Sequence, residues 1–109
     1  MTVYVIQRQM KWDNDTEEWV PQFNMNQAHE YGEVVYLLGP KATPYDKKVV
    51  RELKLKLKDF SSSDFLLLTG NPCLIGLATA IASRKSGGFL KFLQWSGKYN
   101  KYLEIGVVI

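Results

Sequence analysis

Residues 64–85 read DFLLLTGNPCLIGLATAIASRK, and this stretch decides the fold. The continuous apolar run over residues 64–69 is typical of a strand that is buried on both faces of a sheet. Gly70 then interrupts the run, and Asn71 followed by Pro72 is a common helix-start signal. Residues 72–85 are apolar on most sides until Arg84 and Lys85, and Gly87-Gly88 follows. The stretch therefore predicts a buried strand leading into a helix that lies deep against a sheet.

The same strand-to-helix arrangement precedes it. Residues 33–38, EVVYLL, predict another buried strand, which ends at Gly39-Pro40. Thr43, Pro44 and Asp46 then match a capping box, so we expect a helix from Pro44 to Phe60 with an apolar stripe at helical spacing. Residues 89–95 predict a third strand, and a tight turn at 96–98 leads into a fourth, antiparallel one ending at Ile109.

The order of these elements predicts a single α/β domain over residues 1–109. A β-α-β-α-β series requires right-handed crossovers and a largely parallel centre, so we expect a small Rossmann-like core with a mixed sheet. The N-terminal strand (2–10) and the C-terminal hairpin are expected to supply antiparallel edges. Between them, residues 18–22 predict a short returning strand and 27–30 a helical turn capped by Asn24 or Asn26.

Composition excludes several classes of protein. The 109 residues contain one cysteine, Cys73, so neither an internal disulfide nor a cysteine zinc site can form. Cys73 is expected to be a small core residue, and the lone histidine, His29, a surface residue. No signal peptide or membrane span is recognisable, which favours a cytoplasmic protein without membrane contact. We expect no catalytic residue, no metal and no cofactor, and hence a non-enzymatic protein.

Two loops are candidates for binding a ligand. Both follow the carboxyl ends of expected parallel strands and lead into helix N-termini, so they should meet at the edge where open α/β sheets bind ligands. A nucleotide or phosphate group could be held there by Lys41, Thr43, Thr69, Gly70 and Asn71. The alternative is that Thr43 and Asn71 merely cap helices, because no phosphate-binding glycine motif is present.

The charge distribution suggests a basic surface. Residues 1–39 carry a net charge of −4 and residues 40–109 one of +7. Within the expected first helix, Lys47, Arg51, Lys54 and Lys58 recur on one face. Such a face can bind nucleic acid or an acidic protein, but it is equally typical of the solvated side of an amphipathic helix.

Aromatic and basic residues alternate around the C-terminal hairpin. Trp95, Tyr99 and Tyr102 are interspersed with Lys98 and Lys101. Aromatic side chains among lysines can stack on single-stranded nucleic acid or anchor a protein partner. Packing of the aromatic rings across the two strands is the alternative.

Two segments resemble a known group of proteins. Residues 64–72 fit a D-[FY]-L-L-L-x-G-[ND]-P pattern, and LQWSGK at 93–98 fits a second motif. In these two segments the chain is similar to small proteins encoded by tailed bacteriophages, including marine cyanophages. Residues 21–32 also resemble the N-terminal part of those proteins. The resemblance implies a viral protein that acts in the cytoplasm of an infected bacterium, and it implies no activity and no catalytic residues.

The sequence therefore favours a phage accessory protein that binds a host or phage protein, with transcription and replication as the candidate processes. Nucleotide binding at the two loops and nucleic-acid binding through the basic helix are the alternatives. The last strand, residues 102–109, ends in VVI with nothing after it to cover an edge. An exposed strand edge favours pairing, so we also expect a homodimer through this strand.

Overall fold

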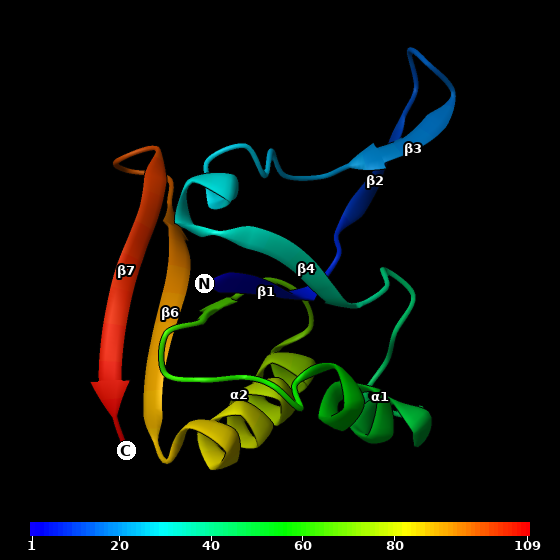
Figure 1. Cartoon of the computed structure of the whole chain (residues 1–109). Coiled ribbons are helices and arrows are strands. Elements are labelled where there is room, and N and C mark those ends of the chain that lie inside the picture. The colour runs from blue at the N-terminus through cyan, green and yellow to red at the C-terminus, as the bar shows by residue number, and fades with distance from the viewer.

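The computed structural model covers residues 1–109 and is built on a five-stranded sheet (Figure 1). In order across the sheet, the strands are β4 (Glu33–Leu38), β1 (Thr2–Gln7), β5 (Phe65–Leu67), β6 (Phe89–Ser96) and β7 (Lys101–Val108). The first four are mutually parallel, and β7 returns antiparallel to β6. The predicted α/β fold with a mixed sheet and a C-terminal antiparallel hairpin is confirmed.

The prediction that the N-terminal strand forms an antiparallel edge is wrong. β1 lies inside the sheet, parallel to both β4 and β5. Its residues Val3 to Gln7 are all buried, so both faces of the strand are covered. A strand buried on both faces belongs in the interior of a sheet, where neighbouring strands satisfy both sets of backbone groups.

Both α-helices cover the same face of the sheet (Figure 1). The second of them, α2 (Pro72–Ser86), begins as predicted, because the Asn71 side chain accepts a hydrogen bond from the Cys73 N–H at 2.8 Å. It ends at Gly87, whose φ of 65° is the left-handed conformation that favours glycine. Leu74, Ala78 and Ala82 of α2 pack on Ile6 and Leu66 of the sheet in one apolar core.

The first helix, α1 (Lys48–Lys56), is shorter than predicted at both ends. Thr43 does not cap it; the backbone N–H of Asp46 donates to the Thr43 carbonyl, and the Asp46 side chain accepts from the Lys48 N–H. Thr43 and Asp46, which were predicted to cap the helix, therefore stabilise a turn at residues 43–46 that precedes it. Leu57 and Phe60 remain buried beyond the last helical residue because the chain continues along the core.

The other face of the sheet is covered by the first crossover, between β1 and β4. It contains a hairpin of β2 (Met10–Asp13) and β3 (Glu18–Pro21) and the short 3₁₀ helix η1 (Ala28–Tyr31). The hairpin projects away from the body (Figure 1), and its Trp12 and Trp19 rings meet edge to face. The helical turn is capped by neither predicted asparagine, because Gln27 precedes it and Asn24 bonds to the Asn26 N–H. Neither α-helix has the length and hydrophobicity required to cross a bilayer.

Candidate functional site

The two loops predicted to hold a ligand meet around the side chain of Gln7. The Gln7 Nε2 donates to the carbonyls of Gly39 (3.2 Å) and Ala42 (3.0 Å), and its Oε1 accepts from the Asn71 N–H at 2.9 Å. Gln7 is buried at the carboxyl end of β1, between the loops that follow β4 and β5. The position at which open α/β sheets bind ligands is therefore filled by the protein's own amide.

Of the predicted ligand residues, Gly70 and Asn71 contact this amide, whereas Lys41 lines a separate hollow with Met10, Trp19 and Pro40. Gly70 is in contact with Gln7, since a Cβ built on it would lie 2.5 Å from the Gln7 Cβ. The Asn71 side chain is engaged in capping α2, and Lys41 and Thr43 are exposed on the outer side of their loop. Gln7 was not among the residues predicted to bind a ligand. One feature of the sequence could have indicated its role: Gln7 is a polar residue that directly follows the apolar run VYVI (residues 3–6), at the end of a strand.

An apolar cavity of about 230 Å³ lies beside this point, on the face of the sheet that the helices leave free. Its floor comes from the end of β5, its side from β6 and β7, and its rim from the loop that follows the projecting hairpin. The lining residues are Gln22, Phe23, Asn24, Met25, Leu67, Leu68, Thr69, Trp95 and Tyr102. The cavity therefore brings Thr69 of the predicted loop together with Trp95 and Tyr102 of the predicted aromatic hairpin.

The aromatic residues of the hairpin divide between packing and exposure. Trp95 and Tyr102 are directly opposite each other, with ring centroids 5.1 Å apart in an edge-to-face arrangement. Tyr102 is buried and its hydroxyl lies 3.8 Å from the Met25 Sδ, whereas Trp95 is 41% exposed at the cavity mouth. Tyr99 is exposed in the turn, where the Nζ atoms of Lys98 and Lys101 lie 5.3 and 6.0 Å from its ring centre.

The chemistry of the cavity favours contact with an apolar group. Six of its nine lining residues are hydrophobic, and Tyr102 is the lining residue with a titratable group. Phe23, 43% exposed, faces the same cavity as Trp95. Pockets for drug-sized ligands usually have about 300–1,000 Å³. A smaller apolar hollow with two exposed aromatic rings suits one or two side chains of a protein partner better than a whole nucleotide.

Burial of Tyr102 predicts a measurable dependence of stability on alkaline pH. Burial, followed by the nearby Tyr36, raises the pKa of the Tyr102 hydroxyl above its ordinary value of 10.0. The unfolded chain therefore loses this proton first, so the stabilisation is complete below about pH 10 and is lost as pH rises through the folded-state pKa. Urea unfolding at about pH 9 and pH 11 should show a smaller loss for Tyr102→Phe than for the wild type. An equal loss in both proteins would contradict this assignment.

The predicted basic face is exposed but lies apart from the cavity. Lys47, Arg51, Lys54 and Lys58 are all exposed; Arg51 and Lys54 lie within α1, Lys47 just precedes it, and Lys58 follows its end. α1 packs on β4 at one end of the sheet, whereas the hairpin of β6 and β7 forms the other end. The sequence-predicted partner surface is therefore divided between two sides of the molecule.

Cys73 and His29 do not form a reactive pair. Cys73 is exposed in the first turn of α2, so the prediction that it is a core residue is wrong. The physical reason is that α2 turns its buried stripe, which includes Leu74 and Ala78, toward the sheet and leaves Cys73 on the outer side. His29 is exposed, as predicted, in η1 on the opposite face of the sheet.

The strand order, numbered along the five strands of the main sheet, is 2-1-3-4-5, which places the chain in the class of small α/β proteins with a doubly wound strand order. The chain belongs to the Phage Pam3 gp32-like protein family, whose profile matches residues 1–109. This membership confirms the resemblance to phage proteins and assigns no activity. No curated protein and no solved structure matches the chain.

Proposed function

We propose that this phage protein is a non-enzymatic accessory factor that binds a host or phage protein in the cytoplasm of an infected bacterium. The observation that carries the proposal is the apolar cavity of about 230 Å³ with Phe23 and Trp95 exposed at its mouth. Large aromatic residues around a pocket are typical of the energetic centre of a protein interface. An apolar side chain of the partner would occupy the cavity.

Polar and basic groups around the cavity are consistent with the rim of an interface. Gln22 and Asn24 line it from the loop after the hairpin of β2 and β3. Lys98 and Tyr99 are exposed in the turn after β6, and Lys101 is exposed at the start of β7. An interface is generally apolar at its centre and polar at its rim. The positive charge of the turn would favour a partner with acidic residues beside its apolar anchor, because opposite charges accelerate and orient association.

Alanine substitution of Phe23 tests the proposal. A tagged protein is incubated with nuclease-treated lysate of phage-infected bacteria, and the bound proteins are identified by mass spectrometry. We expect Phe23→Ala to lower the recovery of the specific partner at least tenfold, because a central aromatic residue of an interface contributes about 2 kcal/mol or more. Trp95→Ala should have a similar effect, although it also removes the contact with Tyr102.

Tyr45→Ala is the matched control. Tyr45 is 92% exposed in the loop before α1 and does not line the cavity, so its removal should leave recovery unchanged. Equal recovery with Phe23→Ala, Trp95→Ala and the wild type would exclude the cavity as the binding site. A parallel incubation with untreated lysate completes the test: a partner recovered there by all variants, but lost after nuclease treatment, would instead indicate binding through nucleic acid.

A further inference from the structure

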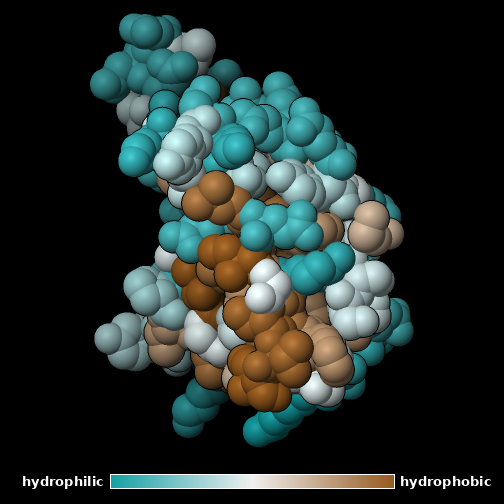
Figure 2. All heavy atoms as spheres, turned by 90° about the vertical axis from the view of Figure 1, so that its left-hand side faces the viewer, coloured by the Kyte–Doolittle hydropathy of each residue, from teal (hydrophilic) through white to brown (hydrophobic).

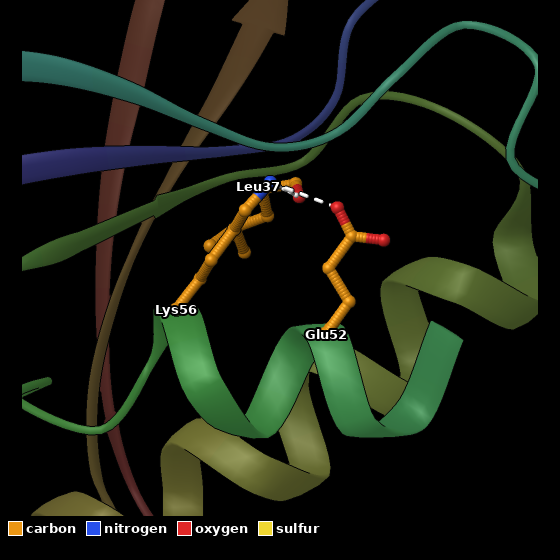
Figure 3. A network of polar contacts seen from close by, with 3 residues as sticks. All are labelled: Leu37, Glu52 and Lys56. Atoms are coloured by element: carbon orange, nitrogen blue, oxygen red, sulfur yellow. Dashed lines mark hydrogen bonds and ion pairs between the residues drawn. The ribbon is translucent and has the colours of Figure 1, made fainter. Parts of the chain in front are cut away.

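The two edges of the main sheet differ in whether a side chain from elsewhere in the chain occupies one of their backbone groups. At the β4 edge, the Leu38 carbonyl accepts from the Arg8 N–H, so the preceding carbonyl, that of Leu37, points away from β1. The Lys56 Nζ donates to this Leu37 carbonyl at 2.7 Å and is held by Glu52 at 2.9 Å (Figure 3). A lysine placed over an edge strand is a common protection against pairing with another chain.

The β7 edge has no such protection. The Ile109 N–H donates to the Gly88 carbonyl, so by the alternation of an antiparallel ladder Leu103, Ile105 and Val107 bond to β6. The backbone N–H and C=O groups of Tyr102, Glu104, Gly106 and Val108 therefore point outward. No hydrogen bond from another segment of the chain reaches them. This edge is eight residues long, contains no proline, and offers four residues that can pair.

An apolar row accompanies these free backbone groups. Leu103, Ile105 and Val107 share the face of the sheet that carries the helices, but α2 packs on β1 and β6 and leaves them 36–38% exposed. Val108 and Ile109 extend the apolar surface to the end of the chain. Figure 2, which views the molecule from the side of β7, shows the resulting hydrophobic patch.

We infer that β7 pairs antiparallel with β7 of a second copy of this chain, with Ile105 opposite Ile105 of that copy. In this register Tyr102 lies opposite Val108 and Glu104 opposite Gly106, so all four outward-pointing residues of each copy form hydrogen-bonded pairs. The two sheets join into one of ten strands.

The side chains of β7 favour this register over its neighbours. Shifting the centre of the pairing to residue 104 would place two glutamates directly opposite each other, which is destabilising. Shifting it to residue 106 would leave Tyr102 without a partner within β7, because this strand ends at Val108. With the centre at residue 105, Leu103 faces Val107 of the second copy, and the two apolar rows become continuous.

Cysteine cross-linking tests the register. Ile105 would form a non-hydrogen-bonded pair, in which the two Cα atoms are about 4.5 Å apart, a distance that a disulfide can span. In a Cys73→Ser background, which removes the exposed native thiol, we expect Ile105→Cys to form a covalent dimer of twice 12.5 kDa under mild oxidation. The matched control, Leu103→Cys, should remain uncross-linked, since the two copies of residue 103 would lie about 13 Å apart along the strands.

Solution mass provides the second measurement. Wild-type protein should have the mass of a dimer by light scattering, and Ile105→Lys, which places two like charges at the centre of the pairing, should have that of a monomer with an unchanged circular dichroism spectrum. A monomeric wild type at high concentration would overturn the inference. Cross-linking of Leu103→Cys as efficiently as Ile105→Cys would exclude this register. Neither result bears on the cavity, whose mouth residue Phe23 lies outside β7.

Discussion

Replacing Gln7 by leucine is expected to lower the free energy of unfolding by about 3 kcal/mol. The substitution retains the size of the side chain but removes the partners of the Gly39 and Ala42 carbonyls and of the Asn71 N–H. Each buried polar group that loses its partner costs about 1–3 kcal/mol, and burial of the leucine offsets part of the total. Urea unfolding should show the midpoint decrease by roughly 2 M, at an m-value of about 1.5 kcal/mol/M.

Gln27→Leu is the control for this experiment. The Gln27 Nε2 makes one exposed hydrogen bond, to the Asn100 carbonyl, and water can replace it. Its loss should change the free energy of unfolding by less than about 0.5 kcal/mol. If Gln7→Leu were as stable as Gln27→Leu, the amide of Gln7 would not hold the two loops together.

Gly70→Ala should destabilise the protein by a similar amount, about 3 kcal/mol. Gly70 has a φ of +119°, a conformation that residues with a side chain rarely adopt. A Cβ at this position would also lie 2.5 Å from the Gln7 Cβ and 2.7 Å from its Oε1. The loop must therefore move away from Gln7, which weakens the hydrogen bond to Asn71. Thermal unfolding of the variant should show a melting temperature lower by roughly 10 °C or more.

Gly39→Ala offers a contrast on the neighbouring loop. Gly39 does not have a positive φ, and nothing lies within 4 Å of a Cβ built on it. Alanine at a compatible glycine position restricts the unfolded chain and stabilises a protein by about 0.4–1 kcal/mol. The two variants should therefore shift the melting temperature in opposite directions. A loss of stability in Gly39→Ala comparable to that in Gly70→Ala would show that the close approach to Gln7 is not the cause.

The two proposed binding surfaces share one residue, Tyr102, which contributes its side chain to the cavity and its backbone to the β7 edge. The cavity lies at the carboxyl ends of β5 and β6, on the face without α-helices. The apolar row of β7 lies on the opposite face, and the free backbone groups point along the plane of the sheet. A dimer formed through β7 would thus present two cavities, and two-point attachment to a partner with repeated sites would increase the overall affinity.

Local signals predicted the second half of the chain well. Asn71 and Pro72 start α2 and Gly87 ends it because each acts on backbone groups within a few residues. The apolar runs at 33–38 and 64–69 both contain strands, and their alternation with helices implies parallel crossovers. Only β5 is buried throughout; the prediction of a buried strand is wrong for β4, which is half-buried because it lies at the edge of the sheet. In the same way, a single turn at residues 97–100 makes the final hairpin antiparallel.

Other features depended on contacts between distant residues. Thr43-Pro44-x-Asp46 has the composition of a helix start, yet the tertiary structure uses it as a turn before Lys48. No local property of the chain places β1 between β4 and β5, because β1 pairs with residues that lie 31 positions (Thr2 with Glu33) and 62 positions (Val3 with Phe65) further along the chain. Thr69, Gly70 and Asn71, the predicted ligand residues, do lie at the carboxyl edge, but the amide that fills this position comes from Gln7.

The sequence by itself therefore determined the fold class, the position of α2 and the antiparallel hairpin, because capping, turns and hydrophobic runs act over short distances. Only the tertiary structure decided which strand is central, which side chains line the cavity and which sheet edge stays open. Each of these depends on where distant segments meet. Phe23 and Trp95 line one cavity, and Lys56 binds the Leu37 carbonyl at the β4 edge while no side chain binds the β7 edge. Such pairings follow from packing the whole chain, and no stretch of a few residues encodes them.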